Sequence, residues 1–509
     1  MSGRVTHRDL PVFPVSPPSG AGGAGEGVRS ARGLEGRLEA VGQPEGPRIG
    51  LVTLGCDKNT VDSERMMASL VGHGARVTTG VEGARIVIVN TCGFIEAARE
   101  QSVETILEAC ALKEAGGVDA VVAVGCMVQR YGDELAREIP EVDLFMGITD
   151  MPRLVPELQD RGFLPDPETL PNMERPLRLL STETSHTSFL KISEGCDHTC
   201  AFCAIPHMRG LHRSVPVAEL VAEARELEAA GVRELNIISQ DTTWYGRDLR
   251  RAAVKAAGPG GTPDSVPLLP DLLRALLAGT EVPWFRLFYM YPSGITPELV
   301  ELLASEPRIL PYLDLPIQHG SDAVLRRMRR PERQETIRQR VRDLRESIPG
   351  IVLRTTVIVG FPGETDAEFE DMMGLLEELA FDRVGAFTYS PEEGTPAAEM
   401  AEQVPESVKR ERLEALMDLQ RGISWEANEA LVGRVEALLV DRLVDDDPEY
   451  VAEGRIRGQA IDVDGLTRIL PDEAARTLRP GDLVPVRIED ALEYDLVARV
   501  VPPPEPSVP

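Results

Sequence analysis

Three cysteines stand close together in the stretch "SEGCDHTCAFCAIPHMRG". This loop triad (Cys196, Cys200 and Cys203) has the spacing CxxxCxxC and follows an apolar, strand-like run. A structural zinc ion usually takes four protein ligands, often as two separated pairs. Only three cysteines are grouped here. His198 and His207 are close in the sequence and could supply a fourth ligand, so a zinc site is an alternative. A four-iron cluster held by three thiolates fits better, because its fourth iron stays free to bind a cofactor or substrate.

Three further cysteines lie far upstream and far apart. Each member of this upstream triad (Cys56, Cys92 and Cys126) follows a short apolar run, which is typical of a strand buried on both faces of a parallel sheet. Ligand sites in open α/β sheets form beyond the carboxyl ends of the strands, so these cysteines can converge there. Converging thiolates repel one another unless a metal neutralises them. The alternative is three buried cysteines that act as small hydrophobic residues.

The seventh cysteine, Cys110, is predicted to be a core residue. It shares a helical face with Val103, Ile106 and Leu107. No apolar run approaches the roughly 18 residues that a membrane span needs, and the first residues lack the apolar core of a signal peptide. We therefore expect a cytoplasmic enzyme with reduced thiols, in which cysteines point to metal binding or catalysis rather than to disulfides.

The elements that must position these cysteines divide the chain into five parts. Residues 1–46 are rich in Gly, Pro, Ser and Arg and are predicted to be disordered. Residues 47–160 alternate apolar strands with helices and predict an open α/β domain. Residues 182–413 show six strand–helix alternations, which predict a barrel or part of one. Residues 424–500 contain short strands with turn signals, as in a small β-barrel, and 501–509 form a Pro-rich tail.

The sequence also predicts one long loop and one short strand within these domains. The stretch "VKAAGPGGTPDSVP" (254–267) has the composition of a flexible loop. The stretch "AIDVDG" (460–465) is interpreted as one of the short strands of the last barrel.

The CxxxCxxC pattern resembles the signature of the radical S-adenosylmethionine (SAM) superfamily. In that superfamily the open iron of a [4Fe-4S] cluster chelates SAM, and reduction of the cluster cleaves SAM to a 5′-deoxyadenosyl radical. The resemblance implies that the loop triad holds this cluster. It also implies a SAM pocket that includes Phe202, Gln318, Ser321 and Gly360. His319 could face the same pocket or be a structural histidine with satisfied hydrogen bonds.

The order of domains is similar to that of the methylthiotransferase family, over about residues 47–490. That family combines an N-terminal methylthiotransferase domain, a partial (β/α) radical SAM barrel and a small C-terminal β-barrel called TRAM. The resemblance implies that the upstream triad binds a second [4Fe-4S] cluster, where the transferred sulfur is held and methylated by one SAM. Another SAM would supply the radical that removes hydrogen from an unactivated carbon, which is not acidic and so needs a radical cofactor.

Two branches of this family differ in substrate. MiaB-type enzymes modify a tRNA adenosine, whereas RimO-type enzymes modify the β-carbon of an aspartate in the twelfth small-subunit ribosomal protein. The stretches "LGCDKNTVDSE" and "ISEGCDHTCAFCAIPHMRG" resemble the RimO branch. The net charge is −29, and residues 426–500 carry about 18 acidic and about 9 basic side chains. An acidic surface suits a basic ribosomal protein better than tRNA phosphates, although it could also serve only solubility.

The resemblance also implies the partners of the reaction. They are the ribosomal protein, free or within the ribosomal particle, a sulfur donor, and a reductant such as flavodoxin or ferredoxin. A monomer without membrane association is expected. The alternatives are a tRNA adenosine methylthiotransferase and a non-catalytic iron–sulfur RNA-binding protein.

Overall fold

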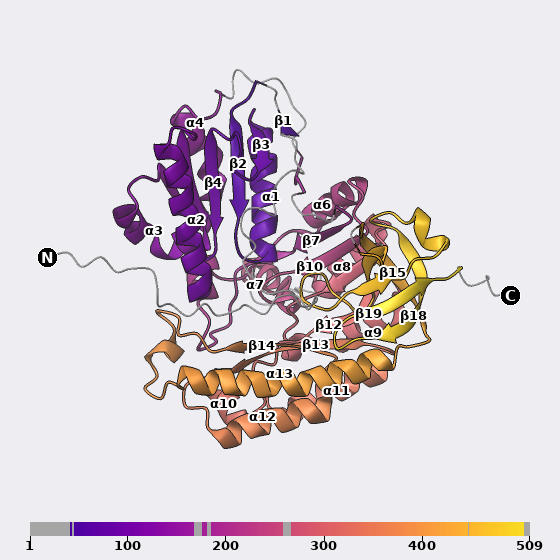
Figure 1. The fold of residues 1–509 in the computed structure, drawn as a ribbon. Coiled ribbons are helices and arrows are strands. Elements are labelled where there is room, and N and C mark those ends of the chain that lie inside the picture. The colour runs from indigo at the N-terminus through magenta and orange to yellow at the C-terminus, as the bar shows by residue number, and fades with distance from the viewer. Residues whose placement is uncertain are drawn as a thin grey trace.

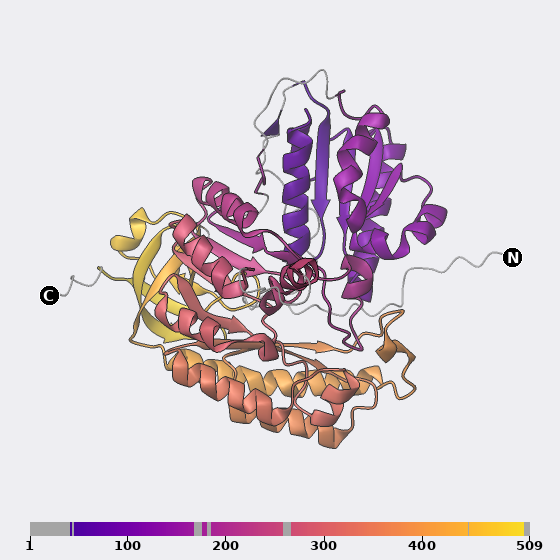
Figure 2. The ribbon, with the colours of Figure 1, turned by 180° about the vertical axis from the view of Figure 1, so that it is seen from behind.

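The computed structural model describes residues 41–42, 45–166, 176–180, 185–257, 266–445 and 447–502. Two six-stranded sheets and a closed five-stranded barrel follow one another along the chain. Figures 1 and 2 show the N-terminal unit above the core and the C-terminal barrel at the side of the core. The predicted fold class, an open α/β domain, a partial (β/α) barrel and a small β-barrel, is confirmed.

The first sheet has the strand order β1-β3-β2-β4-β5-β6, and its pairs are parallel except β1 with β3. The strands are β1 (Val41–Gly42), β2 (Arg48–Thr53), β3 (Arg76–Thr79), β4 (Ile86–Thr91), β5 (Ala120–Gly125) and β6 (Leu144–Gly147). The helices are α1 (Asp57–Val71), α2 (Glu96–Glu114), α3 (Cys126–Glu138) and α4 (Leu154–Asp160). Strands β4 and β5 are buried along their whole length, which explains their unbroken apolar sequence.

Part of the segment predicted to be disordered is ordered in the structure. Val41 and Gly42 form β1, which pairs with the edge strand β3. A free sheet edge offers unpaired backbone groups to any nearby chain, and composition does not reveal this. Most of the remaining segment, 1–40 and 43–44, and most of the Pro-rich tail, 503–509, lie outside the described residues.

The second sheet forms the core and has the strand order β14-β13-β12-β11-β10-β7, with all pairs parallel. Its strands are β7 (Thr187–Lys191), β10 (Glu234–Ile238), β11 (Trp284–Leu287), β12 (Ile309–Asp314), β13 (Val352–Val359) and β14 (Arg383–Thr388). A separate short pair, β8 (Ser193–Glu194) and β9 (Arg213–Ser214), follows β7. The helices are α5 (Ile205–Arg209), α6 (Val217–Ala229), α7 (Arg247–Ala257), α8 (Leu269–Gly279), α9 (Pro297–Ser305), α10 (Asp322–Arg327), α11 (Gln334–Ser347), α12 (Asp366–Leu379) and α13 (Glu406–Glu429).

The two faces of the core sheet have different partners. Side chains such as Leu235 and Phe285 pack with the helices in one large apolar cluster. On the other face, Tyr312 lies in a cluster with Val61 of α1 and Leu439 of the C-terminal barrel. The three units therefore meet on one face of the core sheet.

The C-terminal barrel is closed by five strands in the order β15-β16-β17-β19-β18. They are β15 (Val435–Leu443), β16 (Ala452–Ile456), β17 (Thr467–Ile469), β18 (Leu483–Ala491) and β19 (Leu496–Val500). Residues 424–429, assigned to this domain from the sequence, are the last residues of α13.

The structure corrects both finer predictions. The stretch 460–465 is a turn: Asp462 has a φ of 64°, and Asp464 accepts a hydrogen bond from the backbone of Ala460 at 2.9 Å. The strand lies just after it, at β17. The predicted loop 254–267 begins with the last residues of α7, because "VKAA" contains good helix formers. Its glycine-rich part, 258–265, lies outside the described residues.

Candidate functional site

The upstream triad gathers at one edge of the first sheet. Cys56 precedes α1 after β2, Cys92 follows β4, and Cys126 is the first residue of α3 after β5. Strands β2, β4 and β5 are parallel neighbours, so their carboxyl ends lie side by side. A Cβ added to Gly55, whose φ is +93°, would come within 2.9 Å of Cys92 Sγ. This glycine lets the loop of the first cysteine approach the second.

Asn59 ties the three cysteine-bearing segments together. Its side-chain nitrogen donates to the carbonyls of Leu54 at 2.8 Å and Thr91 at 3.1 Å, which lie just before the first two cysteines. Its side-chain oxygen lies 3.9 Å from Cys126 Sγ and accepts a hydrogen bond of 2.6 Å from Arg209. Sequence reasoning missed Asn59 as a site residue, although it stands within "CDKN".

Two of the upstream thiols, Cys92 and Cys126, are costly to ionise without a metal. The pKa of Cys92 is raised and that of Cys126 is raised to about 12, in both cases chiefly by burial. The charge of Cys56 contributes to both increases, whereas the guanidinium of Arg209 opposes them. A bound metal group would offset the cost of holding several thiolates together. The donor set therefore fits an iron–sulfur cluster.

The loop triad lies between β8 and α5. The pKa values of Cys196 and Cys203 are raised to about 12 each, chiefly by burial and with a smaller contribution from Cys200. In the described parts of the chain, no three His, Cys, Asp or Glu side chains are grouped as ligands of a metal ion. Each thiolate of a four-iron cluster binds a different iron, so such thiols need not converge on one point. The donor set is thus suited to a cluster rather than to one zinc ion.

The two histidines considered as zinc ligands have other surroundings. His198 Nε2 forms a 2.6 Å hydrogen bond with Asp241, and its ring stacks on Tyr291 with the centroids 4.0 Å apart. His207 is exposed on α5. Neither joins the cysteines in a metal-binding group within the described ranges.

Buried ion pairs connect the two triad-bearing units. Arg209, six residues after Cys203, contacts Asp62 of α1 at 3.1 Å and Glu194 at 2.8 Å. Lys191 contacts the same two carboxylates. Burial opposes the ionisation of Glu194, but Lys191 and Arg209 outweigh it and lower its pKa to about 2.

Apolar contacts join the same two elements. Cys126 packs in a small buried cluster with Ala204 and Met208, which directly follow the loop triad. The segment after the loop triad therefore rests against the element that carries the last upstream cysteine.

The predicted SAM-pocket residues lie after β12, after β13 and in the triad loop. Phe202 packs with Phe361 in an apolar cluster. Gln318 has a φ of 71°, and its backbone exchanges hydrogen bonds with β13. Ser321 precedes α10, and Gly360 follows β13 with a φ of 72°. A side chain at position 360 would clash with Lys409, so close packing alone explains why a glycine stands here. Contact of these residues with SAM stays a prediction.

His319 joins two of these loops. Its Nδ1 accepts a 2.9 Å hydrogen bond from the backbone of Ser321, so its Nε2 carries the proton and donates to Glu364 at 3.2 Å. Glu364 also accepts from the backbone of Gly360 at 2.9 Å and from Arg412 at 2.7 Å. Both ring nitrogens are thus used within the protein, which supports a structural role for this histidine.

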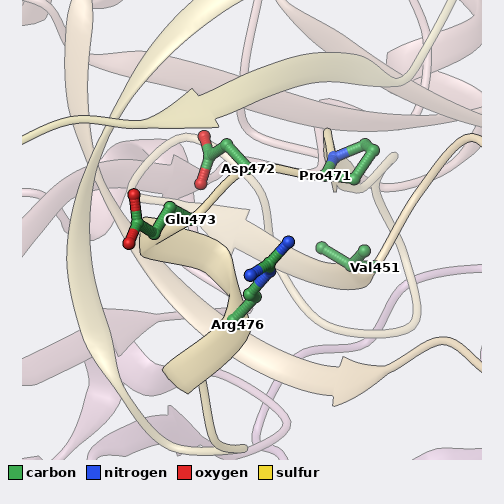
Figure 3. Close-up of a pocket in the computed structure, with 5 residues that line it drawn as sticks. All are labelled: Val451, Pro471, Asp472, Glu473 and Arg476. Carbon is green, nitrogen blue, oxygen red and sulfur yellow. The ribbon is translucent and has the colours of Figure 1, made fainter.

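A shallow hollow lies on the C-terminal barrel (Figure 3). It is lined by Val451, Pro471, Asp472, Glu473 and Arg476. None of the predicted site residues lines it. Separately, none of the helices in the described ranges has the length and apolar character needed to cross a bilayer.

Comparison with known proteins identifies all three units. The radical SAM superfamily matches residues 190–376, "Uncharacterized protein family UPF0004" matches 48–147, and the TRAM domain matches 432–501. A cobalamin-binding radical SAM methyltransferase, TsrM from Kitasatospora setae, has a TM-score of 0.47 at 13% identity, over 74% of this chain and 89% of its own.

Curated relatives cover nearly the same span. "Ribosomal protein uS12 methylthiotransferase RimO" of Anaeromyxobacter sp. (strain K) is 46% identical over 89% of this chain and 93% of its own. The protein of the same name in Geobacter sulfurreducens is 43% identical over 89% of this chain and 98% of its own. The chain belongs to the RimO methylthiotransferase family, which confirms the resemblance drawn from the sequence. It is a SAM-dependent radical transferase with a [4Fe-4S] cluster.

Proposed function

We propose that this enzyme adds a methylthio group to the β-carbon of an aspartate in ribosomal protein uS12. Its relatives carry the name of that substrate and reaction type. The observation that carries the proposal is the contact between the two triad-bearing segments across one interface, where Arg209 of the loop-triad segment bonds to Asn59 of the upstream segment at 2.6 Å. A reaction that needs both a radical source and a sulfur carrier requires such proximity.

Each triad has its own proposed cofactor. The loop triad would hold the [4Fe-4S] cluster that binds SAM, and the upstream triad would hold a second [4Fe-4S] cluster. When bound, these groups would supply a radical that removes a hydrogen atom and a place to carry the transferred sulfur. The chain itself buries Cys92 and Cys126, partly covers the loop triad, and fixes the two loops against each other through Arg209 and Asn59.

The proposed SAM pocket is made by Phe202, Gln318, Ser321 and Gly360. The last three follow the carboxyl ends of neighbouring parallel strands, where barrel enzymes place their ligands. The bonds of His319 to Ser321 and Glu364 would keep these loops fixed when SAM enters.

The C-terminal barrel would favour a basic partner. Exposed acidic side chains lie in the loop after β15 (Asp445, Asp447 and Glu449), near the end of β18 (Glu489 and Asp490) and just after it (Glu493). Negative potential attracts a basic ribosomal protein and repels tRNA phosphates. We infer that uS12 is modified either free or in the ribosomal particle, by a cytoplasmic monomer that uses a sulfur donor and a reductant such as flavodoxin or ferredoxin.

Intact-mass measurement of uS12 from cells with and without this gene tests the proposal. The mass should fall by one methylthio group when the gene is deleted. Loss of methylthioadenosine from tRNA with unchanged uS12 would instead assign the MiaB-type activity. A purified, reconstituted and reduced protein that cleaves no SAM would favour a non-catalytic iron–sulfur protein.

A further inference from the structure

Two planar side chains lie against the ring of Tyr291 beside the loop triad. The ring of His198 is nearly parallel to it, at 7° and a centroid distance of 4.0 Å. The guanidinium carbon of Arg330 lies 3.7 Å from the centroid of the same ring. We call His198, Tyr291 and Arg330 the Tyr291 group.

Buried polar partners fix both outer members of this group. His198 bonds to Asp241 at 2.6 Å, and Arg330 pairs with Glu332 at 3.2 Å. Arg330 also donates to the carbonyl of Pro316 at 2.8 Å. Pro316 belongs to the loop after β12, whereas Glu332 lies two residues after Arg330, so the guanidinium is held both by its own segment and by a separate loop of the core.

The Tyr291 group meets one cysteine of the loop triad. Cys200 Sγ lies 4.0 Å from the Tyr291 hydroxyl and 4.0 Å from Arg330 Nη1, within hydrogen-bond reach for sulfur. The other two cysteines differ, because Cys196 and Cys203 have backbone N–H groups as neighbours. Among the described residues, Cys200 is thus the member of the loop triad whose sulfur has hydrogen-bond donors from side chains, Tyr291 and Arg330.

Such donors have a known consequence for an iron–sulfur cluster. Hydrogen bonds to the cysteine sulfurs and nearby positive charge raise its reduction potential, because the reduced state carries more negative charge. Outer-shell partners also fix the orientation of a metal ligand. Both effects converge on Cys200.

We propose that the Tyr291 group positions Cys200 and raises the reduction potential of the cluster that Cys200 holds. This inference rests on the proposed assignment of Cys200 as a cluster ligand. Arg330 supplies the charge and one donor, and Tyr291 supplies a second donor and the surface on which the guanidinium lies. Both are positioning residues.

The test measures the loop-triad cluster alone, in the full chain with Cys56→Ala, Cys92→Ala and Cys126→Ala. An EPR-monitored redox titration without SAM gives the midpoint potential, and an iron assay gives cluster content. Arg330→Met should keep the iron but lower the ratio of reduced to oxidised cluster at a fixed potential about tenfold, which equals a one-electron shift of about 59 mV. Arg326→Met, on the exposed side of α10, removes the same charge as a matched control and should leave the potential unchanged.

Two further variants keep the test decisive if Arg330→Met lowers the iron content. Tyr291→Phe keeps the ring and removes the hydroxyl, so it should shift the potential in the same direction by less. Arg330→Lys keeps the charge and should recover part of the loss. A wild-type potential in Tyr291→Phe, or in Arg330→Met with full iron, would overturn the inference. Absence of any cluster in the parent protein would instead count against the proposed ligand assignment.

Discussion

The residues of the upstream triad are separated by whole strand–helix units, whereas those of the loop triad lie in one loop between β8 and α5. Hydrogen bonds between parallel strands place the first set, because β2, β4 and β5 are paired in register. The loop triad has no such ladder. It is held by single bonds from distant segments, such as Ala201 N to Met328 O at 3.0 Å and Cys196 N to Gly210 O at 3.0 Å.

This difference separates two ways of bringing three cysteines into one site. Sheet topology can bring distant residues together without any local spacing rule. A loop keeps its spacing in the sequence but depends on side chains from elsewhere, such as Tyr291 and Arg330, for its surroundings. Substitutions should therefore affect the two triads separately.

The largest expected effect comes from the loop triad. Cys196→Ala should abolish SAM cleavage and methylthio transfer together, because the radical source is lost, and it should lower iron content by about four atoms per chain. Formation of 5′-deoxyadenosine after reduction measures the first activity. Continued SAM cleavage by this variant would remove the assignment of the loop triad.

The upstream triad should give a split result. Cys56→Ala should retain SAM cleavage and lose methylthio transfer, with about four iron atoms left per chain. Mass spectrometry of uS12 and assay of 5′-deoxyadenosine in the same reaction measure both activities. Full transfer by this variant would show that the upstream triad carries no sulfur.

The interface between the triads should contribute strongly to stability. Arg209→Met removes a positive charge that neutralises the buried carboxylates of Asp62 and Glu194. Breaking a buried ion pair in this way costs about 3–5 kcal/mol of folding free energy. Urea unfolding measures the loss. Arg213→Met, at an exposed position, is the control and should change stability by less than about 0.5 kcal/mol.

The same interface predicts an acid-sensitive stability. The pKa of Glu194 falls from 4.5 to about 2 on folding, so its contribution is present above pH 4.5 and is lost as the pH falls towards 2. In Arg209→Met the folded-state pKa should lie closer to 4.5, so the acid-dependent loss of stability should be smaller and should be complete at a higher pH. Unfolding curves between these pH values measure the difference, and identical pH profiles for the two proteins would contradict it.

The sequence was informative where the signal was local or strictly periodic. It predicted β2, β4 and β5 of the first sheet and all six strands of the core sheet, because buried parallel strands read as apolar runs, and it placed Cys56, Cys92 and Cys126 after neighbouring strands. It did not predict β1, β3 or β6. It did not reveal Asn59 or Arg209, since their roles depend on contacts between units that composition does not encode. It also missed β17, whose three residues are too few for a periodic pattern.

Asn59 should show how far the upstream triad depends on side chains. Asn59→Ala removes two donors to carbonyls and one acceptor, and each buried group left without a partner costs about 1–3 kcal/mol. We expect faster loss of upstream iron to a chelator, while the loop-triad cluster stays. Equal iron loss from both clusters would show that the two sites are not separable.

The smallest effect is expected for Cys110→Ala, which tests whether burial or placement after a strand marks a ligand cysteine. Cys110 is as buried as Cys92 and Cys126, but it lies within α2 beside Ile106 and not after the carboxyl end of a strand. Leu107, predicted to share its face, is 50% exposed, because α2 buries only a narrow stripe. Cys110→Ala should therefore leave iron content and both activities unchanged and cost at most about 1 kcal/mol in a urea titration. Iron loss in this variant would mean that burial, rather than placement at adjacent strand ends, marks the cysteines that bind metal in this fold.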